Sequence, residues 1–317
     1  MLTFRSFRNT DPPALAALWR SRAGQPGLFQ PISCDLLEEL VFAKLYFDYG
    51  GLLLACDDGR LVGFAHAGFG PNAERNWTST EIGVICVLLV HPDCNEAEVS
   101  AGLLDRCEEY LRGRGARVLY GGGLAPLGPF YLGLYGASEL PGVLDSDATA
   151  RQAFAARGYQ ETERTSLLRR ELTGFEPPVS RQQMQVRRQM VVEVSVDVST
   201  RTWWEASALG KFDLTRFDLL PRSGGAPVAT ALFRTMEPSG TVSLSRAMGL
   251  TELTVDESHR RRGLAVFLLS EAFRQFLRQG IVHVDMLVPQ SNSGALELFR
   301  KLGFQQFDQG SVWRKDA

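Results

Sequence analysis

Apolar and polar residues follow two different periods along the chain, and together they predict an alternation of strands and helices. Continuous or alternating apolar runs predict strands at 52–56, 61–67 and 83–90. The polar residues 57–59, which end in glycine, predict a tight hairpin turn between the first two of these strands. A long helix is predicted over 95–114, because apolar side chains recur there at helical spacing: Val99, Leu103, Leu104, Cys107 and Leu111.

The second half of the chain shows the same order of elements. Residues 216–221 and 227–235 predict a hairpin, and 243–255 predict a strand that leads into a long amphipathic helix ending near Leu277. The next strand is predicted over 281–288. Upstream of the hairpin, we expect a strand over 185–198 and a helix over 201–209.

Around the turn before the long helix, the two halves align without a gap at an offset of 165 residues. This offset places Val255 on Val90 and Gly280 on Gly115. The proline-containing stretch 173–180 is the best linker candidate between them. The sequence therefore predicts two domains, 1–173 and 181–317, that repeat one plan.

Composition narrows the class of protein. The chain has 317 residues, and its 34 Lys and Arg against 36 Asp and Glu give a net charge of -2, which does not suggest a nucleic-acid partner. The start of the chain lacks the apolar core of a signal peptide, and the apolar run 83–90 is too short to span a membrane. The five cysteines form no C-x-x-C pair, so we expect no metal site and a reducing, cytoplasmic location.

The strongest chemical signal is the turn between the strand 250–255 and the long helix. Arg260, Arg261 and Arg262 precede Gly263 and Ala265. Glycine allows the backbone to approach a ligand closely, and the free N–H groups at a helix start favour an anion. These residues fit a diphosphate cradle, although on their own they fit a solvated basic turn equally well.

The context on both sides resembles the acyl-CoA-binding signature of the GNAT superfamily of acetyltransferases. That signature is a strand ending in Val, then (Gln/Arg)-x-x-Gly-x-(Gly/Ala), then an amphipathic helix, and here it falls on Val255, Arg260, Gly263 and Ala265. A second GNAT signature, Asn-x-x-Ala-x-x-Leu-Tyr-x-x-x-Gly-Phe, matches residues 292–304, except that Phe stands where Tyr is usual.

The resemblance implies an α/β fold of two tandem GNAT-like domains, each a central mixed β-sheet flanked by helices. It implies an N-acetyltransferase that moves an acetyl group directly from acetyl-CoA to a primary amine of a small molecule. A bulge near 253–255 would offer a backbone N–H to the acyl carbonyl. The cofactor-binding positions of the family correspond here to Leu253, Thr254, Val255, Arg260, Arg261, Arg262, Gly263, Leu264, Ala265, Asn292, Ala295 and Phe299.

Catalysis requires a base for the amine and a proton donor for the leaving thiolate. Glu252 is the nearest candidate base, and the alternative is a strand carboxylate that faces solvent. Phe299 has no hydroxyl and cannot act as the acid that the resemblance implies at its position. Three alternatives stay open: Ser291, Ser293 or a water serves instead, protonation is not needed for the rate, or this half does not catalyse. His283 and Asp285 share one strand face, and a structural pair is as consistent with the sequence as a catalytic one.

The first copy carries Asn95, Glu98 and Ser100 where the second has Arg260, Gly263 and Ala265. An acidic turn without glycine should bind a diphosphate poorly, so we expect the first copy to have lost the cofactor. Two other hypotheses stay open. One is a non-catalytic acyl-CoA-binding or interaction protein, and the other, weaker one is a nucleotide-binding protein, which the absence of Gly-Lys-Ser/Thr disfavours.

Overall fold

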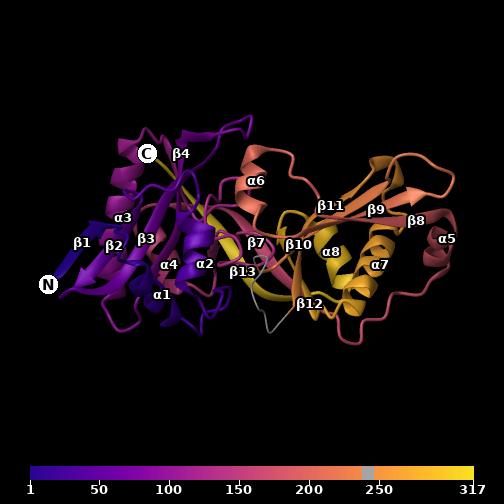
Figure 1. Cartoon of the computed structure of the whole chain (residues 1–317), viewed down its shortest axis with the longest axis horizontal. Coiled ribbons are helices and arrows are strands. Elements are labelled where there is room, and N and C mark those ends of the chain that lie inside the picture. The colour runs from indigo at the N-terminus through magenta and orange to yellow at the C-terminus, as the bar shows by residue number, and fades with distance from the viewer. Residues whose placement is uncertain (238–245) are drawn as a thin grey trace. The chain divides into compact units, whose positions relative to one another are not determined.

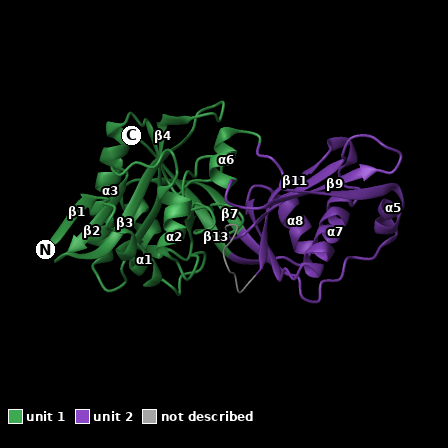
Figure 2. Cartoon of the chain, in the orientation of Figure 1, with its two compact units in different colours: residues 1–166, 201–209, 308–317 green, residues 167–200, 210–307 purple. Residues whose placement is uncertain are grey.

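The computed structural model describes residues 1–237 and 246–317, which form two compact units (Figure 1). Figure 2 shows that neither unit is a continuous stretch of chain. Unit 1 contains residues 1–166, 201–209 and 308–317, and unit 2 contains residues 167–200 and 210–307. The last ten residues of the chain therefore belong to the unit built mainly from its first half.

Unit 1 is a mixed sheet with helices packed on it. Its strands follow the order β1-β2-β3-β4-β5-β13, where β4 and β5 are parallel and β13 is antiparallel to β5. The strands are β1 (Leu2–Ser6), β2 (Leu52–Asp57), β3 (Arg60–Pro71), β4 (Thr78–Val90), β5 (Val118–Gly121), β6 (Val143–Leu144) and β13 (Gln305–Asp316). The helices are α1 (Pro12–Arg20), α2 (Cys34–Leu37) with the π-helical turn η1 (Glu38–Phe42), α3 (Glu96–Gly113), α4 (Ala148–Ala156) and α6 (Trp203–Leu209).

The core of unit 1 lies where α3 packs on the sheet. The apolar positions that predict this helix are buried as expected, since Leu103, Leu104, Cys107 and Leu111 have no exposed surface. The predicted hairpin is present as β2 and β3, which pair in an antiparallel ladder. The ladder between β13 and β5 sets Trp313 opposite Gly121, so the last strand of the chain extends this sheet beyond β5.

Unit 2 repeats the plan. Its strands follow the order β7-β12-β11-β10-β9-β8, and β11 and β12 are parallel. The strands are β7 (Gln160–Glu171, of which 167–171 lie in this unit), β8 (Met190–Val196), β9 (Leu214–Pro221), β10 (Ala229–Thr235), β11 (Ala247–Val255) and β12 (His283–Pro289). Its helices are α5 (Arg181–Gln189), α7 (Leu264–Arg278) and α8 (Ser293–Lys301), and η2 (Glu257–His259) is a single 3-10 turn.

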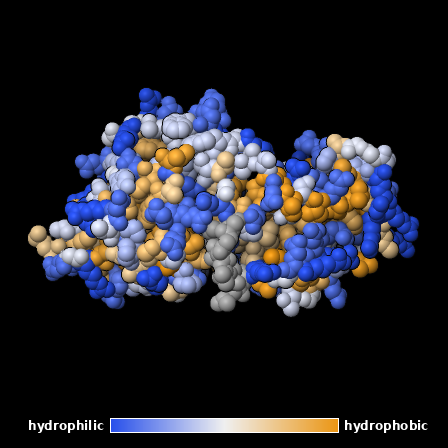
Figure 3. Space-filling view, in the orientation of Figure 1, coloured by the Kyte–Doolittle hydropathy of each residue, from blue (hydrophilic) through white to orange (hydrophobic). Residues whose placement is uncertain are grey.

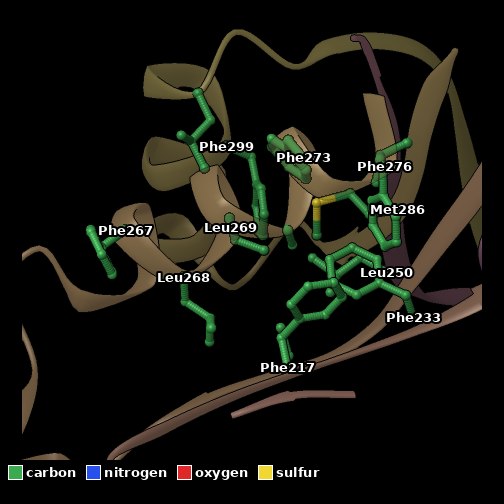
Figure 4. Packing of buried hydrophobic residues seen from close by; sticks show 14 of the residues in the cluster. Phe217, Phe233, Leu250, Phe267, Leu268, Leu269, Phe273, Phe276, Met286 and Phe299 are labelled. Atoms are coloured by element: carbon green, nitrogen blue, oxygen red, sulfur yellow. The ribbon is translucent and has the colours of Figure 1, made fainter. Parts of the chain in front are cut away.

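Helix α7 supplies seven of the buried hydrophobic residues in the core of unit 2. Figure 4 shows its aromatic and aliphatic side chains, including Phe276, directed at residues of the sheet. The ring centroids of Phe276 lie 4.9 Å from Phe233 and 5.5 Å from Phe217, in edge-to-face geometry. Such pairs add about 1 kcal/mol each to the burial of apolar area. This packing holds the last turn of α7 against β9 and β10.

One predicted element of unit 2 is wrong. Residues 185–198 were expected to form a strand, but 181–189 form α5 and only 190–196 form β8. The sequence of α5 is rich in Gln and Arg, which favour helix, and Val186 is its buried side chain. The predicted strand 243–255 is present as Ala247–Val255, and its residues 243–245 lie outside the described residues.

The strand that ends each half of the sequence belongs, in whole or in part, to the unit built mainly from the other half. Residues 308–316 of β13 count with unit 1, and residues 167–171 of β7 count with unit 2. The bounds 1–173 and 181–317 stay a prediction about the repeated sequence modules, and each module ends in a strand that the other unit uses.

Candidate functional site

The site begins where the two parallel strands of unit 2 separate. The ladder between β11 and β12 runs from Ala247 opposite His283 to Leu250 opposite Met286 and ends there. Beyond it, β11 continues to pair with β10 as far as Val255. One edge of residues 251–255 therefore leaves the sheet ladder at this fork, and its backbone polar groups are directed toward the space between the strands.

A β-bulge lies at the fork. Leu232 of β10 faces Glu252, whereas the next residue, Phe233, faces Leu250, so Thr251 is the extra residue. The hydroxyl of Thr251 donates a hydrogen bond to the carbonyl oxygen of Leu232 at 3.1 Å. The expected position of the bulge, residues 253–255, is thus two residues too late.

The turn after β11 leaves the first N–H groups of α7 open. Arg261 and Gly263 both have left-handed backbone, with φ of 63° and 76°. Gly263 is the N-cap of α7 and makes no side-chain cap hydrogen bond. Because these first amides point away from the helix and carry the positive end of its dipole, the turn is suited to an anion.

A cavity of about 750 Å³ opens between this turn, the free edge of β11 and helix α8. Its basic residues are His259, Arg260, Arg261 and Lys301. Glu297 also lines it and is paired with Lys301 at 2.7 Å, and Arg260 is paired with Glu257 at 3.1 Å. The wall thus combines apolar strand residues with an excess of positive charge, as a ligand with an apolar arm and phosphate groups requires.

Most of the predicted cofactor residues line this cavity. They are Leu253, Thr254, Val255, Arg260, Arg261, Gly263, Leu264, Ala265 and Ala295.

The remaining predicted cofactor residues lie outside its lining. Arg262 is exposed. The side-chain oxygen of Asn292 caps α8, accepting a hydrogen bond from the Ala295 N–H at 3.1 Å. Phe299 is 2% exposed and packs edge-to-face on Phe304, with ring centroids 5.2 Å apart. Asn292 and Phe299 therefore stabilise helix α8, which forms one wall of the cavity, and do not line the cavity themselves.

The two candidate catalytic residues occupy different settings. Glu252 directly follows the bulge and lies on the face of β11 opposite to Leu253, which packs on the core. Ser291 is exposed in the loop between β12 and α8.

The predicted pair His283 and Asp285 is present. Asp285 is 1% exposed and accepts two hydrogen bonds from Arg169, both at 2.7 Å. His283 Nε2 lies 3.8 Å from Asp285 Oδ1, and burial lowers the pKa of His283 while Asp285 opposes this effect. The bidentate partner of Asp285 was not anticipated, because Arg169 lies 116 positions earlier in the sequence.

Sequence reasoning also missed one wall of the cavity. Pro178, Ser180, Gln182 and Gln183 line it from the segment that contains α5. The signal was present, because Ser180 and Gln183 have the Ser-x-x-Gln spacing of a helix-capping box. In the structure the Ser180 hydroxyl accepts a hydrogen bond from the Gln183 N–H at 3.1 Å.

Unit 1 contains the same fork without the open cavity. Ile85 opposite Gly121 ends the ladder of β4 with β5, and Cys86 is the bulged residue, each 165 positions before its counterpart. A pocket at this fork, lined by Ile85 and Cys86, holds only about 10 Å³. It is lined by residues of the following loop and helix, including Tyr135, whose hydroxyl accepts a hydrogen bond from the Leu144 N–H at 3.0 Å. Side chains of unit 1 thus fill the space that is open in unit 2.

A family model described as Acetyltransferase (GNAT) family matches the chain twice, over residues 18–123 and 193–304. These matches cover more than half of the chain. The chain belongs to the GNAT acetyltransferase family. This membership indicates an N-acyltransferase that uses acyl-CoA, and it confirms the family suggested by the two sequence signatures.

Solved structures confirm the tandem GNAT fold. A tandem GNAT protein from the clavulanic acid biosynthesis pathway aligns over 100% of this chain and 98% of its own, with a TM-score of 0.70 and 15% identity. A GCN5-related N-acetyltransferase from Sphaerobacter thermophilus aligns over 99% and 95%, with a TM-score of 0.63 and 16% identity.

A glucosamine N-acetyltransferase region of a fungal multi-domain GH3 β-N-acetylglucosaminidase matches 99% of this chain and 38% of its own, with a TM-score of 0.70 and 17% identity. At these identities the likeness shows the fold alone. A search of curated proteins finds no match. Within residues 1–237 and 246–317, no helix is long and apolar enough to cross a membrane.

Proposed function

We propose that this GNAT protein is an acetyl-CoA-dependent N-acetyltransferase that acts on a primary amine of a small molecule, by direct transfer in its C-terminal domain. The observation that carries the proposal is the cavity of about 750 Å³ at the fork of β11 and β12, which ends at the open start of α7. An acyl-CoA needs both of these features, since its diphosphate requires donors and its arm requires an apolar, hydrogen-bonding edge.

In this proposal the diphosphate lies at the turn of Arg260, Arg261, Arg262 and Gly263, where the amides of Leu264 and Ala265 begin α7. The free edge of Leu253, Thr254 and Val255 binds the pantetheine arm through its backbone groups. Ala295 contributes to the opposite wall. Asn292 and Phe299 hold α8 in place behind that wall, as the cap of the helix and as a buried ring.

The proposed reaction is attack of the amine nitrogen on the thioester carbonyl carbon. A new C–N bond forms, the carbon–sulfur bond breaks, and the CoA thiolate leaves with the electron pair. Glu252 is the proposed base that takes the amine proton, because it adjoins the bulge where the strands fork. Ser291 is the proposed donor to the thiolate. The buried Phe299 has no hydroxyl and cannot fill that role.

One structural relative supports an amine acceptor. It is described as a glucosamine N-acetyltransferase region, and glucosamine is a small molecule with a primary amine. The balanced charge of this chain, net -2, also fits a small acceptor better than a polyanion.

The test is release of free CoA thiol from acetyl-CoA in the presence of a panel of amino sugars, amino acids and polyamines. Amine-dependent thiol release, with acetylated product found by mass spectrometry, is the expected result. The second candidate, a non-catalytic acyl-CoA-binding protein, is favoured by the lack of a hydroxyl at Phe299. Tight binding of acetyl-CoA without thiol release for any amine would support that candidate and contradict an enzyme.

A further inference from the structure

Helix α5, which lies outside the two GNAT signatures, forms part of the cavity wall. The amides of Gln182 and Gln183 both line the cavity, together with Pro178 and Ser180. Gln183 Nε2 donates a hydrogen bond of 3.1 Å to the carbonyl oxygen of Gly263. The helix therefore touches the phosphate turn at its one left-handed glycine.

The contact is close as well as polar. A Cβ built on Gly263 would lie 2.8 Å from Gln183 Nε2 and 3.1 Å from Gln182 Cδ. The space that glycine leaves free is thus filled by these two amide side chains. Substitution at Gly263 would both strain its left-handed backbone and push α5 away.

Besides Gln183, helix α5 is held by one buried side chain and by the Arg222 N–H, which donates a hydrogen bond of 2.8 Å to the carbonyl oxygen of Gln189. Val186 is its buried side chain, at 6% exposed, whereas Gln182 and Gln185 are exposed and Gln183 is half-buried. Figure 3 shows a hydrophilic surface at α5, toward the right-hand side of the view. Burial of Val186 contributes about 1.5–3 kcal/mol and each hydrogen bond about 1 kcal/mol, so the bond to Gly263 is one of a few interactions that attach α5.

The hydrogen bond to Gly263 has a consequence for anion binding. The Gly263 carbonyl oxygen also accepts the first helical bond of α7, from the Phe267 N–H at 3.1 Å. In a planar peptide the carbonyl and the next N–H point in opposite directions. With the carbonyl held by two donors, the N–H of Leu264 is directed out of the helix start. The Gln183 amide also offsets the negative charge of a carbonyl beside the phosphate site.

We infer that Gln183 is a positioning residue for the acyl-CoA diphosphate, and that α5 is a built part of the acyl-CoA site. Gln183 acts through Gly263, by fixing the peptide whose N–H binds the phosphate. Gln182 stands beside it as an amide donor at the cavity wall. This inference rests on the proposed function, because it assigns a part of the same site.

The test compares acetyl-CoA binding by calorimetry in wild type, Gln183→Leu and Gln183→Glu. Loss of the donor in Gln183→Leu should weaken binding about tenfold, or about 1.4 kcal/mol. In Gln183→Glu a carboxylate faces both the carbonyl oxygen and the phosphates, so binding should fall about a hundredfold. S-acetylpantetheine, which lacks the diphosphate, should bind all three proteins alike when followed by NMR.

The matched control is Gln185→Glu, which adds the same charge to an exposed position of α5 that does not line the cavity. Its acetyl-CoA affinity should stay within about twofold of wild type, because exposed charges are screened. The inference is overturned if both Gln183 variants bind acetyl-CoA as wild type does, or if S-acetylpantetheine is weakened equally. A wild-type protein that binds no acetyl-CoA would overturn the proposed function as well.

Discussion

At the scale of single residues, backbone conformation does more than side-chain charge to define the site. Gly263 supplies a left-handed N-cap, and Thr251 supplies the bulge where the strands fork. Phe299 has only a structural role, since its ring packs against Phe304 and has no group that can donate a proton. The sequence signatures locate the glycine correctly because only glycine adopts this conformation without strain. They do not locate the bulge, which depends on pairing with β10.

Glu252 provides the first prediction at this scale. If it is the base, Glu252→Gln should lower kcat about a hundredfold, because the amide cannot take the amine proton. The KM for acetyl-CoA should change little, since Glu252 lies on the other face of β11 from the core-facing Leu253. Steady-state kinetics with the amine found in the thiol-release screen measures both constants. An unchanged kcat, or a loss confined to KM, would remove Glu252 from the mechanism.

His66 provides the second prediction, for unit 1. It is fully buried, its Nδ1 lies 2.9 Å from the Tyr131 hydroxyl, and burial lowers its pKa to about 3. The unfolded chain binds the His66 proton near pH 6.5 but the folded unit does not. Burial of neutral His66 therefore costs no stability above pH 6.5. As the pH falls from 6.5 toward 3, the free energy of unfolding decreases by about 1.4 kcal/mol per pH unit.

His66→Gln keeps a polar partner for Tyr131 and does not titrate. Between pH 6 and pH 4.5, the free energy of unfolding should fall by about 2 kcal/mol less in this variant than in wild type, as measured in urea. An equal decrease in the free energy of unfolding of the two proteins would mean that His66 takes up a proton as readily in the folded chain as in the unfolded chain.

At the scale of elements, the sequence predicts the hairpins and the long helices. It does not predict which distant strands pair or where short polar helices form. Helix α7 is predictable because its apolar residues repeat every third or fourth position. Helix α5 has only Val186 to bury, so it carries no period, and its capping residues were the remaining signal. Strand β13 shows a normal strand pattern, but nothing in it specifies pairing with β5. The alternation of apolar residues shows which face of a strand is buried, but it does not show which strand is its neighbour in the sheet.

The pairing of β7 with β12 leads to a prediction about stability. Asp285 of β12 is buried and held by Arg169 of β7 through two hydrogen bonds of 2.7 Å. Asp285→Ala leaves the guanidinium half-buried without its carboxylate and should destabilise unit 2 by about 2–3 kcal/mol. The exposed pair of Glu297 and Lys301 offers a control, since Glu297→Ala should cost less than about 0.5 kcal/mol. Urea titrations measure the free energy of unfolding of both variants. Equal, small decreases in the two would show that the buried pair does not stabilise the fold.

At the scale of the whole molecule, the chain repeats a fold and differentiates its two copies. Bulge and fork recur at an offset of 165 residues, at Cys86 and Thr251. In unit 2 the fork opens into a cavity of about 750 Å³, and in unit 1 the pocket at the fork holds about 10 Å³. The sequence predicts part of this difference, because Glu98 stands where Gly263 does. It does not predict that side chains such as Tyr135 fill the space, since that depends on how a long loop folds.

The central claim is that each chain binds one acyl-CoA, at the phosphate turn of unit 2. Calorimetry with acetyl-CoA on wild type, Gly263→Glu and Gly280→Glu tests it most directly. Gly280 is also left-handed, with φ of 77°, and lies beyond the opposite end of α7, so its variant matches the strain and the charge without touching the turn. We predict one site per chain in wild type and in Gly280→Glu, and none in Gly263→Glu. Two sites in wild type, or a site that survives in Gly263→Glu, would contradict the account.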